Sequence, residues 1–134
     1  MSHAVIGSGV DRLVHYSLCV RDERAREALT WQFATSVQSL RAHNTNITVA
    51  LFVHGTAPEV IEVCRAFDVV PLDGGEYERR LQALCPTGWA ALAQHPLLHK
   101  FLNFSGMELD RLSQILFCDV DTIFFRDVEQ LFDA

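Results

Sequence analysis

The sequence lacks the features that mark several large classes of protein. No window approaches the roughly eighteen uninterrupted apolar residues of a membrane-spanning helix. The N-terminal stretch MSHAVIGSGVDRLV has neither the basic start nor the apolar segment of a signal peptide. The four cysteines include no C-x-x-C pair, which argues against a zinc knuckle or a thioredoxin-type site. These absences predict a cytoplasmic protein without a transmembrane segment.

Positive charge is also scarce. The chain has 11 Lys and Arg residues against 17 Asp and Glu residues, which gives a net charge of −6. A general nucleic-acid surface needs a basic stripe, so we expect no nucleic-acid partner. An anionic small ligand stays open, because a bound metal ion can reverse the local sign of the charge.

The composition that remains is that of a globular domain. The chain has 134 residues, of which 49% are hydrophobic and 21% are charged. This length supports one domain with its own core and is too short for two ordinary domains. We expect residues 1–12 to be a loose N-terminal leader and residues 13–134 to form the domain.

Strand-like apolar segments alternate with helical segments along the chain. Strands are predicted at 13–20, 46–55, 68–73 and 114–119. After the first strand, apolar residues recur at helical spacing on one stripe: Ala25, Leu29, Phe33, Val37 and Leu40. The second strand is apolar almost without alternation, as in sheets covered on both faces. The alternation predicts an α/β fold of three layers around a mostly parallel sheet.

Local signals predict where several elements begin and end. Asp22 is expected to cap the first helix, and Thr56-Ala57-Pro58-Glu59 predicts a capping box at the start of the next helix. The same pattern recurs at 127–130, before a last helix. Gly74-Gly75 is expected to break the chain ahead of another helix. Pro71 indicates that the third strand lies at an edge of the sheet or ends there.

The stretch QILFCDVDTIFFRD, residues 114–127, places Asp119 and Asp121 inside an apolar run. Burying an unpaired carboxylate is costly, so the pair needs a cation or must lie where the strand ends. Ligands of parallel sheets bind at the carboxyl ends of the strands. Two carboxylates there can converge on Mg²⁺ or Mn²⁺, which keeps positions for water and phosphate oxygens. Aspartates at strand ends also form ordinary turns, so the context decides the meaning of the motif.

That context resembles a known family. The segment LSQILFCDVDTIFFRDVEQLFD is similar to the acidic-motif strand and following helix of GT-A glycosyltransferases, particularly the glycogenin-like family and related nucleotide-diphospho-sugar transferases. HKFLNFSGM resembles the lysine-containing helix of that family, and YSLCVRD resembles its first strand. The likeness extends from about residue 13 to residue 134, with only the acidic segment specific. It implies a three-layer, Rossmann-like GT-A fold.

The resemblance also implies a function and a set of site residues. It predicts a metal-dependent glycosyltransferase that uses a nucleotide-diphosphate sugar, with a UDP-sugar as the expected donor and an unknown acceptor. Asp119 and Asp121 would bind Mn²⁺ or Mg²⁺, with Asp119 also near the ribose, and Lys100 would contact the diphosphate or the sugar. Three further residues would line the nucleotide-base pocket: Ser17, Cys19 and Val20.

Two alternatives stay open at the level of sequence. Family members continue beyond this length and carry a third metal ligand there, so the chain is expected to be the nucleotide-binding part of a longer enzyme. It could equally be a non-catalytic fragment that keeps the fold. A haloacid-dehalogenase-like phosphatase would use Asp119 as the nucleophile and Asp121 as a general acid. However, the acidic motif of such phosphatases follows the first strand of their chain, whereas the motif here follows the fourth predicted strand. Their Thr also lies two positions beyond the second Asp, whereas Thr122 follows Asp121 directly.

Overall fold

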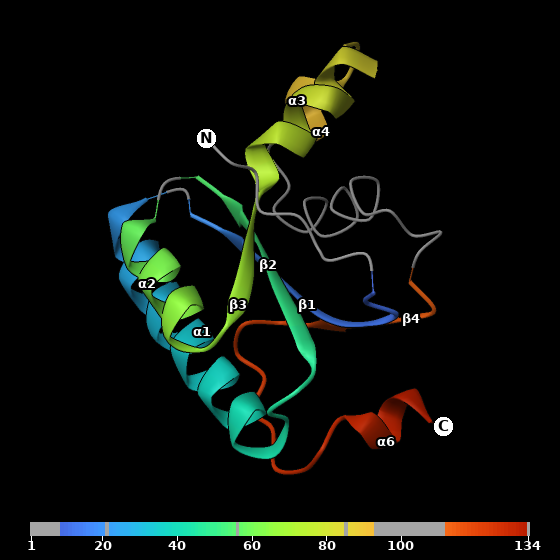
Figure 1. Ribbon diagram of the computed structural model, residues 1–134. Helices are drawn as coiled ribbons and strands as arrows, with labels where there is room; N and C mark the ends of the chain where they lie inside the picture. The colour runs from blue at the N-terminus through green and yellow to red at the C-terminus, as the bar shows by residue number, and fades with distance from the viewer. Residues whose placement is uncertain (1–8, 21, 56, 85, 93–111, 134) are drawn as a thin grey trace.

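The computed structural model describes residues 9–20, 22–55, 57–84, 86–92 and 112–133 (Figure 1). The described elements, in chain order, are β1 (Arg12–Cys19), α1 (Glu23–His43), β2 (Thr48–His54), α2 (Pro58–Ala66), β3 (Val69–Asp73), α3 (Gly74–Leu84), α4 (Trp89–Leu92), β4 (Gln114–Cys118) and α6 (Glu129–Phe132). None of the described helices combines the length and the apolar character that crossing a bilayer requires.

The four described strands form one parallel sheet in the order β3-β2-β1-β4. The prediction of an α/β fold with a parallel sheet is therefore confirmed, and the order is consistent with a Rossmann-like arrangement. Among the described strands β3 lies at an edge, as its Pro71 predicted. The chain places β2 and β3 on one side of β1 and β4 on the other. Such a reversal of strand order opens a crevice at the carboxyl ends of the strands.

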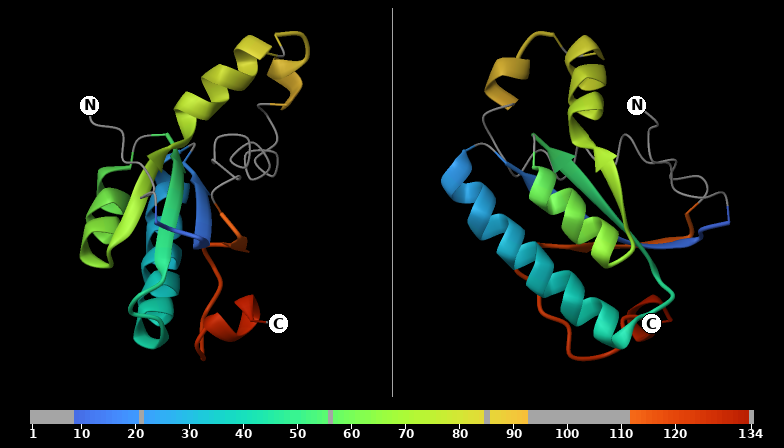
Figure 2. Two further views of the ribbon diagram at one scale, coloured as in Figure 1. Left: turned by 45° about the vertical axis from the view of Figure 1, so that its right-hand side comes forward. Right: turned by 60° about the vertical axis from the view of Figure 1, so that its left-hand side comes forward.

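Helices α1 and α2 pack side by side against one face of the sheet (Figure 2). From the predicted helical stripe, Phe33, Val37 and Leu40 are buried, and Leu29 packs against the same core while half-buried. Their partners are alternate strand residues on this face: Val14, Tyr16 and Leu18 of β1 and Val49, Leu51 and Val53 of β2. The helical spacing in the sequence therefore identified the buried side of α1 correctly.

The second face of the sheet is apolar as well. Leu13 and Phe52 are fully buried there, and the ring of His15 lies between Phe52 and Phe117, with ring centroids 5.1 Å and 5.2 Å apart. Helix α3 continues from β3 beyond the carboxyl edge of the sheet (Figure 1). A full helical layer over this face, and with it the three-layer architecture, stays a prediction.

The start of α1 agrees with the sequence prediction, whereas the predicted cap of α2 is wrong. Asp22 caps α1, its Oδ1 accepting a hydrogen bond from the backbone N–H of Ala25 at 2.7 Å. The N-cap of α2 is Ala57, which offers no side-chain acceptor, and Thr56 lies outside the described residues. Glu59, expected to complete a capping box, instead forms an ion pair with Arg26 of α1 at 3.7 Å.

The predicted chain break at Gly74 and Gly75 is also wrong, because both residues belong to α3. A Cβ on Gly74 would lie 2.5 Å from Cε1 of His54, so glycine lets the helix start directly against the imidazole. Asp73 stabilises this start, since its Oδ1 accepts a hydrogen bond from Gly75 N at 2.9 Å. Gly74 thus serves close packing against His54, and neither glycine forms a turn.

After β4 the chain turns and runs back past α1 to α6, which lies near the amino end of β1 (Figures 1 and 2). Arg12 of β1 donates to Glu129 at 2.7 Å and to Asp133 at 2.9 Å, and it covers the ring of Phe132. Val128 and not Asp127 is the N-cap residue of α6, although Asp127 Oδ1 accepts from Glu129 N at 2.8 Å. The return segment therefore belongs to the same packed unit as the sheet.

Candidate functional site at the carboxyl edge of the sheet

The two predicted metal ligands lie at the carboxyl edge of the sheet, beside β1. Cys118 is the last residue of β4 and pairs with Tyr16 in the parallel register. Strand β1 continues past this pair to Cys19. Asp119 therefore leaves the sheet next to Ser17, on the side of β1 where the strand order reverses. This is the position at which open parallel sheets bind ligands.

Asp119 to Thr122 form a tight turn, which we call the acidic turn. The backbone N–H of Thr122 donates to the carbonyl oxygen of Asp119 at 3.0 Å. The side chain of Val120 packs against the core, whereas the side chains of Asp119 and Asp121 are exposed. The turn therefore buries its apolar residue and presents both carboxylates to solvent, which avoids the cost of burying them.

The residues predicted to line a nucleotide-base pocket divide between the two faces of β1. Side chains alternate along a strand, so Ser17 and Cys19 lie on the same face as His15, and both are half-buried. Val20 packs against the core on the side of α1, and its backbone N–H donates to the carbonyl oxygen of His54 at 2.8 Å. Lys100 lies outside the described residues.

A buried histidine at the same edge was not predicted. His54 is the last residue of β2 and the register partner of Cys19, and 3% of its surface is exposed. Its Nδ1 lies 2.7 Å from Oε1 of Glu78 in α3. A carboxylate at this distance fixes the orientation of the imidazole. The sequence signal was its position at the end of an apolar run, directly before Gly55.

Gly55 allows the ends of β1 and β2 to approach each other. Its φ is +104°, and a Cβ at this position would lie 2.5 Å from the carbonyl oxygen of Val20. Only glycine combines this backbone conformation with such a close contact. The shape of the carboxyl edge around Ser17, Cys19 and His54 therefore depends on this residue.

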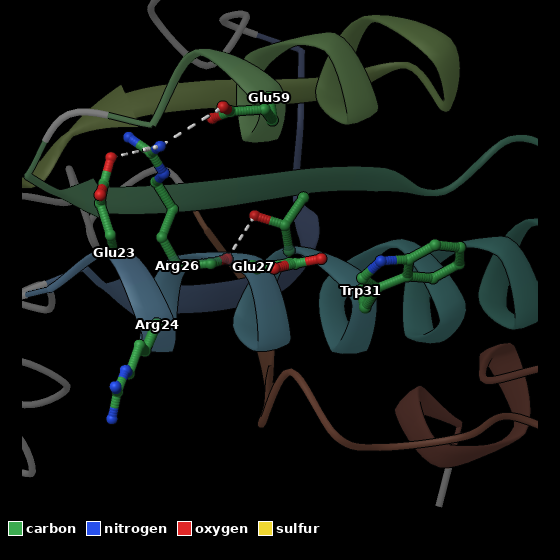
Figure 3. Close-up of a pocket in the computed structure, with 7 residues that line it drawn as sticks. Glu23, Arg24, Arg26, Glu27, Trp31 and Glu59 are labelled. Carbon is green, nitrogen blue, oxygen red and sulfur yellow. Dashed lines mark hydrogen bonds and ion pairs between the residues drawn. The ribbon is translucent and has the colours of Figure 1, made fainter.

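A separate surface depression of about 580 Å³ lies along the first half of α1 and the start of α2 (Figure 3). It is lined by Glu23, Arg24, Arg26, Glu27, Thr30, Trp31 and Glu59. Arg26 bridges Glu23 at 3.4 Å and Glu59 at 3.7 Å, and Trp31 is 69% exposed. Neither carboxylate of the acidic turn lines it, so it does not coincide with the predicted metal site.

The acidic turn offers the chemistry that a hard divalent cation requires, although it is incomplete as a site by itself. Within the part of the chain that the structure describes, no three His, Cys, Asp or Glu side chains are grouped to hold a metal ion. Two exposed carboxylates on one turn supply two oxygen donors. Mg²⁺ and Mn²⁺ commonly take one or two protein carboxylates and fill their other positions with water and substrate phosphates. The residues present therefore fit a cation that is shared with a diphosphate.

In comparisons with known proteins, no family model matches the chain and no curated protein is significantly similar to it in sequence. The fold alone does not determine a function, because parallel α/β sheets support many kinds of chemistry. The acidic turn and its surroundings are therefore the features of this chain that bear on its function.

Proposed function

We propose that the chain is the nucleotide-sugar-binding part of a metal-dependent glycosyltransferase of the GT-A type, with a UDP-sugar as donor. One observation carries the proposal: two exposed carboxylates, Asp119 and Asp121, leave a parallel sheet on a single turn beside β1, where the strand order reverses. The likeness of LSQILFCDVDTIFFRDVEQLFD to the acidic motif of these enzymes supports the same conclusion.

In this proposal Asp119 and Asp121 hold Mn²⁺ or Mg²⁺. The bound ion supplies positive charge that stabilises the departing diphosphate. Ser17 and Cys19 offer a hydroxyl and a thiol at the end of β1, where the nucleoside would lie, and Lys100 would contact the diphosphate. Because the turn carries two negative charges, an anionic donor is repelled unless the cation is present. Donor binding should therefore depend strictly on the metal.

The phosphatase alternative has less support. Its acidic motif follows the first strand of the chain, whereas the acidic turn here follows β4, the last of the described strands. Thr122 also closes the turn directly after Asp121, through its N–H bond to Asp119 O. A phosphate mimic with Mg²⁺ distinguishes this alternative from the glycosyltransferase.

Thermal unfolding with and without ligands tests the proposal. We expect UDP with Mn²⁺ to raise the melting temperature of the parent by several degrees, since a ligand at 100 times its Kd stabilises the folded state by about 2.7 kcal/mol. UDP with EDTA should have no effect. The double variant Asp119→Asn/Asp121→Asn should lose the response. The control Asp11→Asn/Glu27→Gln, which removes two other exposed charges, should keep it.

Other outcomes assign the chain differently. Stabilisation by a phosphate mimic with Mg²⁺ but not by UDP with Mn²⁺ would favour the phosphatase. Stabilisation by neither would favour a non-catalytic fragment. A double Asn variant that responds as the parent does would show that the acidic turn is not the metal site.

A further inference from the structure

The chain is bonded to β1 just before the acidic turn and to α1 just after it. Before the turn, Cys118 pairs with Tyr16 of β1. After the turn, the backbone N–H of Phe124 donates to the hydroxyl oxygen of Ser39 in α1 at 2.9 Å. These two residues are 85 positions apart in the sequence. The path of the chain through the turn is therefore set by two contacts on the same packed unit.

The hydroxyl of Ser39 has a fixed orientation. It donates its own hydrogen to the carbonyl oxygen of Ser36 at 2.6 Å, so its oxygen is left to accept from Phe124. Ser36 is fully buried, and its hydroxyl lies 2.8 Å from the hydroxyl of Tyr16. Ser36 thus contacts both Tyr16, through its hydroxyl, and Ser39, through its backbone carbonyl, so α1 is bonded both to the strand residue that pairs with Cys118 and to Phe124 after the turn.

Apolar packing supports the same geometry. Val120 within the turn and Phe124 after it both pack against the core that contains Val37 and Leu40 of α1. Since the side chains of Asp119 and Asp121 are exposed, packing of their own atoms does little to hold them. The path of the backbone through the turn therefore helps to set where the two carboxylates lie.

We propose that Ser39 is a positioning residue for the metal site: by accepting the N–H of Phe124, it holds the acidic turn so that Asp119 and Asp121 face one cation. This inference rests on the proposed function. Two carboxylates repel each other, so a looser turn would let them separate, and the cation would have to order them on binding. Partners that orient metal ligands are typically worth a 10- to 100-fold change in metal affinity.

Titration with Mn²⁺, following the free ion by electron paramagnetic resonance well below the melting temperature, tests the inference on the full chain. Ser39→Ala should bind Mn²⁺ about 10-fold more weakly than the parent. Ser39→Thr, which keeps a hydroxyl, should recover most of the affinity. Thr35→Ala is the matched control, because Thr35 lies one turn earlier on α1 and its hydroxyl donates only to Trp31 O among the described bonds. It should bind as the parent does.

The outcomes separate this inference from the proposed function. If the parent and Ser39→Ala bind Mn²⁺ equally well, the positioning role is wrong and the metal site stands. Equal weakening in Ser39→Ala and Thr35→Ala would show a general effect on α1 and would also exclude the role. A parent that binds no Mn²⁺, either alone or together with UDP, overturns the proposed function and this inference together. Faster amide exchange of Phe124 in Ser39→Ala alone should accompany the expected loss of affinity.

Discussion

His15 is an ionisable residue at the centre of the sheet. It is fully buried on β1, with its ring tilted against Phe52 and Phe117. Burial lowers the pKa of His15 from 6.5 to about 4, because the charged imidazolium is poorly solvated there. The ring is therefore neutral at pH 7, where it acts as part of an aromatic cluster.

This burial should make the folded state sensitive to acid. In the unfolded chain the histidine takes up a proton below about pH 6.5, whereas in the folded chain it does so only near pH 4. The contribution of His15 to the free energy of unfolding is therefore fully present above pH 6.5. It decreases as the pH falls towards 4, by about 3 kcal/mol in total. His15→Leu should remove this loss.

Urea unfolding of the parent and of His15→Leu at pH 7 and pH 4.5 measures the effect. Between pH 7 and pH 4.5, the free energy of unfolding should fall by about 2 kcal/mol more in the parent than in His15→Leu. His43→Leu, which removes an exposed histidine at the end of α1, is the matched substitution control. Equal losses in the parent and in His15→Leu would mean that another group causes the acid sensitivity.

At the scale of elements, α1 connects the sheet to the segment that follows the acidic turn. Asn44, the C-cap residue of α1, is 5% exposed. Its Nδ2 donates to Leu40 O at 3.0 Å, and its Oδ1 accepts from Val128 N at 2.9 Å. One side chain therefore both ends the helix and anchors the start of α6.

Asn44→Ala should cost about 1–3 kcal/mol, because it leaves a buried N–H of Val128 without its acceptor. Asn44→Asp keeps the acceptor for the N–H of Val128 and loses the donor to the carbonyl oxygen of Leu40. Its loss of stability should therefore come from the helix end and not from Val128. Asn46→Ala, at an exposed position two residues later, should change the stability by less than about 0.5 kcal/mol. Urea unfolding measures all three. A change as small in Asn44→Ala as in Asn46→Ala would contradict the anchoring role.

The sequence predicted the elements whose pattern reflects burial. β2 and the stripe of α1 were identified because their apolar residues follow the sheet and helix periods directly. The cap of α2 and the role of Gly74 were predicted wrongly. In both places a neighbouring element contacts the helix start: Arg26 of α1 forms an ion pair with Glu59, and His54 of β2 occupies the space beside Gly74. Local motifs carry no information about such neighbours.

The candidate site shows the same limit. Asp119 and Asp121 were predicted because the motif, the strand before it and the turn are contiguous in the sequence. The contact of His54 with Glu78 spans 24 residues, and that of Ser39 with Phe124 spans 85. Both depend on which elements the topology brings together, so only the structure could identify them.

At the scale of the whole molecule, a single apolar cluster joins α2, β4 and α6. It contains Cys64 of α2, Cys118 of β4 and Phe132 of α6. Burial raises the pKa of the Cys64 thiol to about 12, and burial together with the charge of Asp119 raises that of Cys118 to about 12. Neither thiol forms its reactive thiolate readily in the folded protein.

These two thiols therefore report whether the molecule opens as one unit. In a Cys19→Ser/Cys85→Ser background, both should react with a thiol reagent only after opening, with equal opening free energies that match the global free energy of unfolding. Mass spectrometry of labelled peptides across a urea series gives each value separately. Because Cys118 directly precedes the acidic turn, a lower value for Cys118 than for Cys64 would mean that β4 opens alone. The turn would then be released while α2 stays packed, so the acidic turn would not belong to the unit that opens globally.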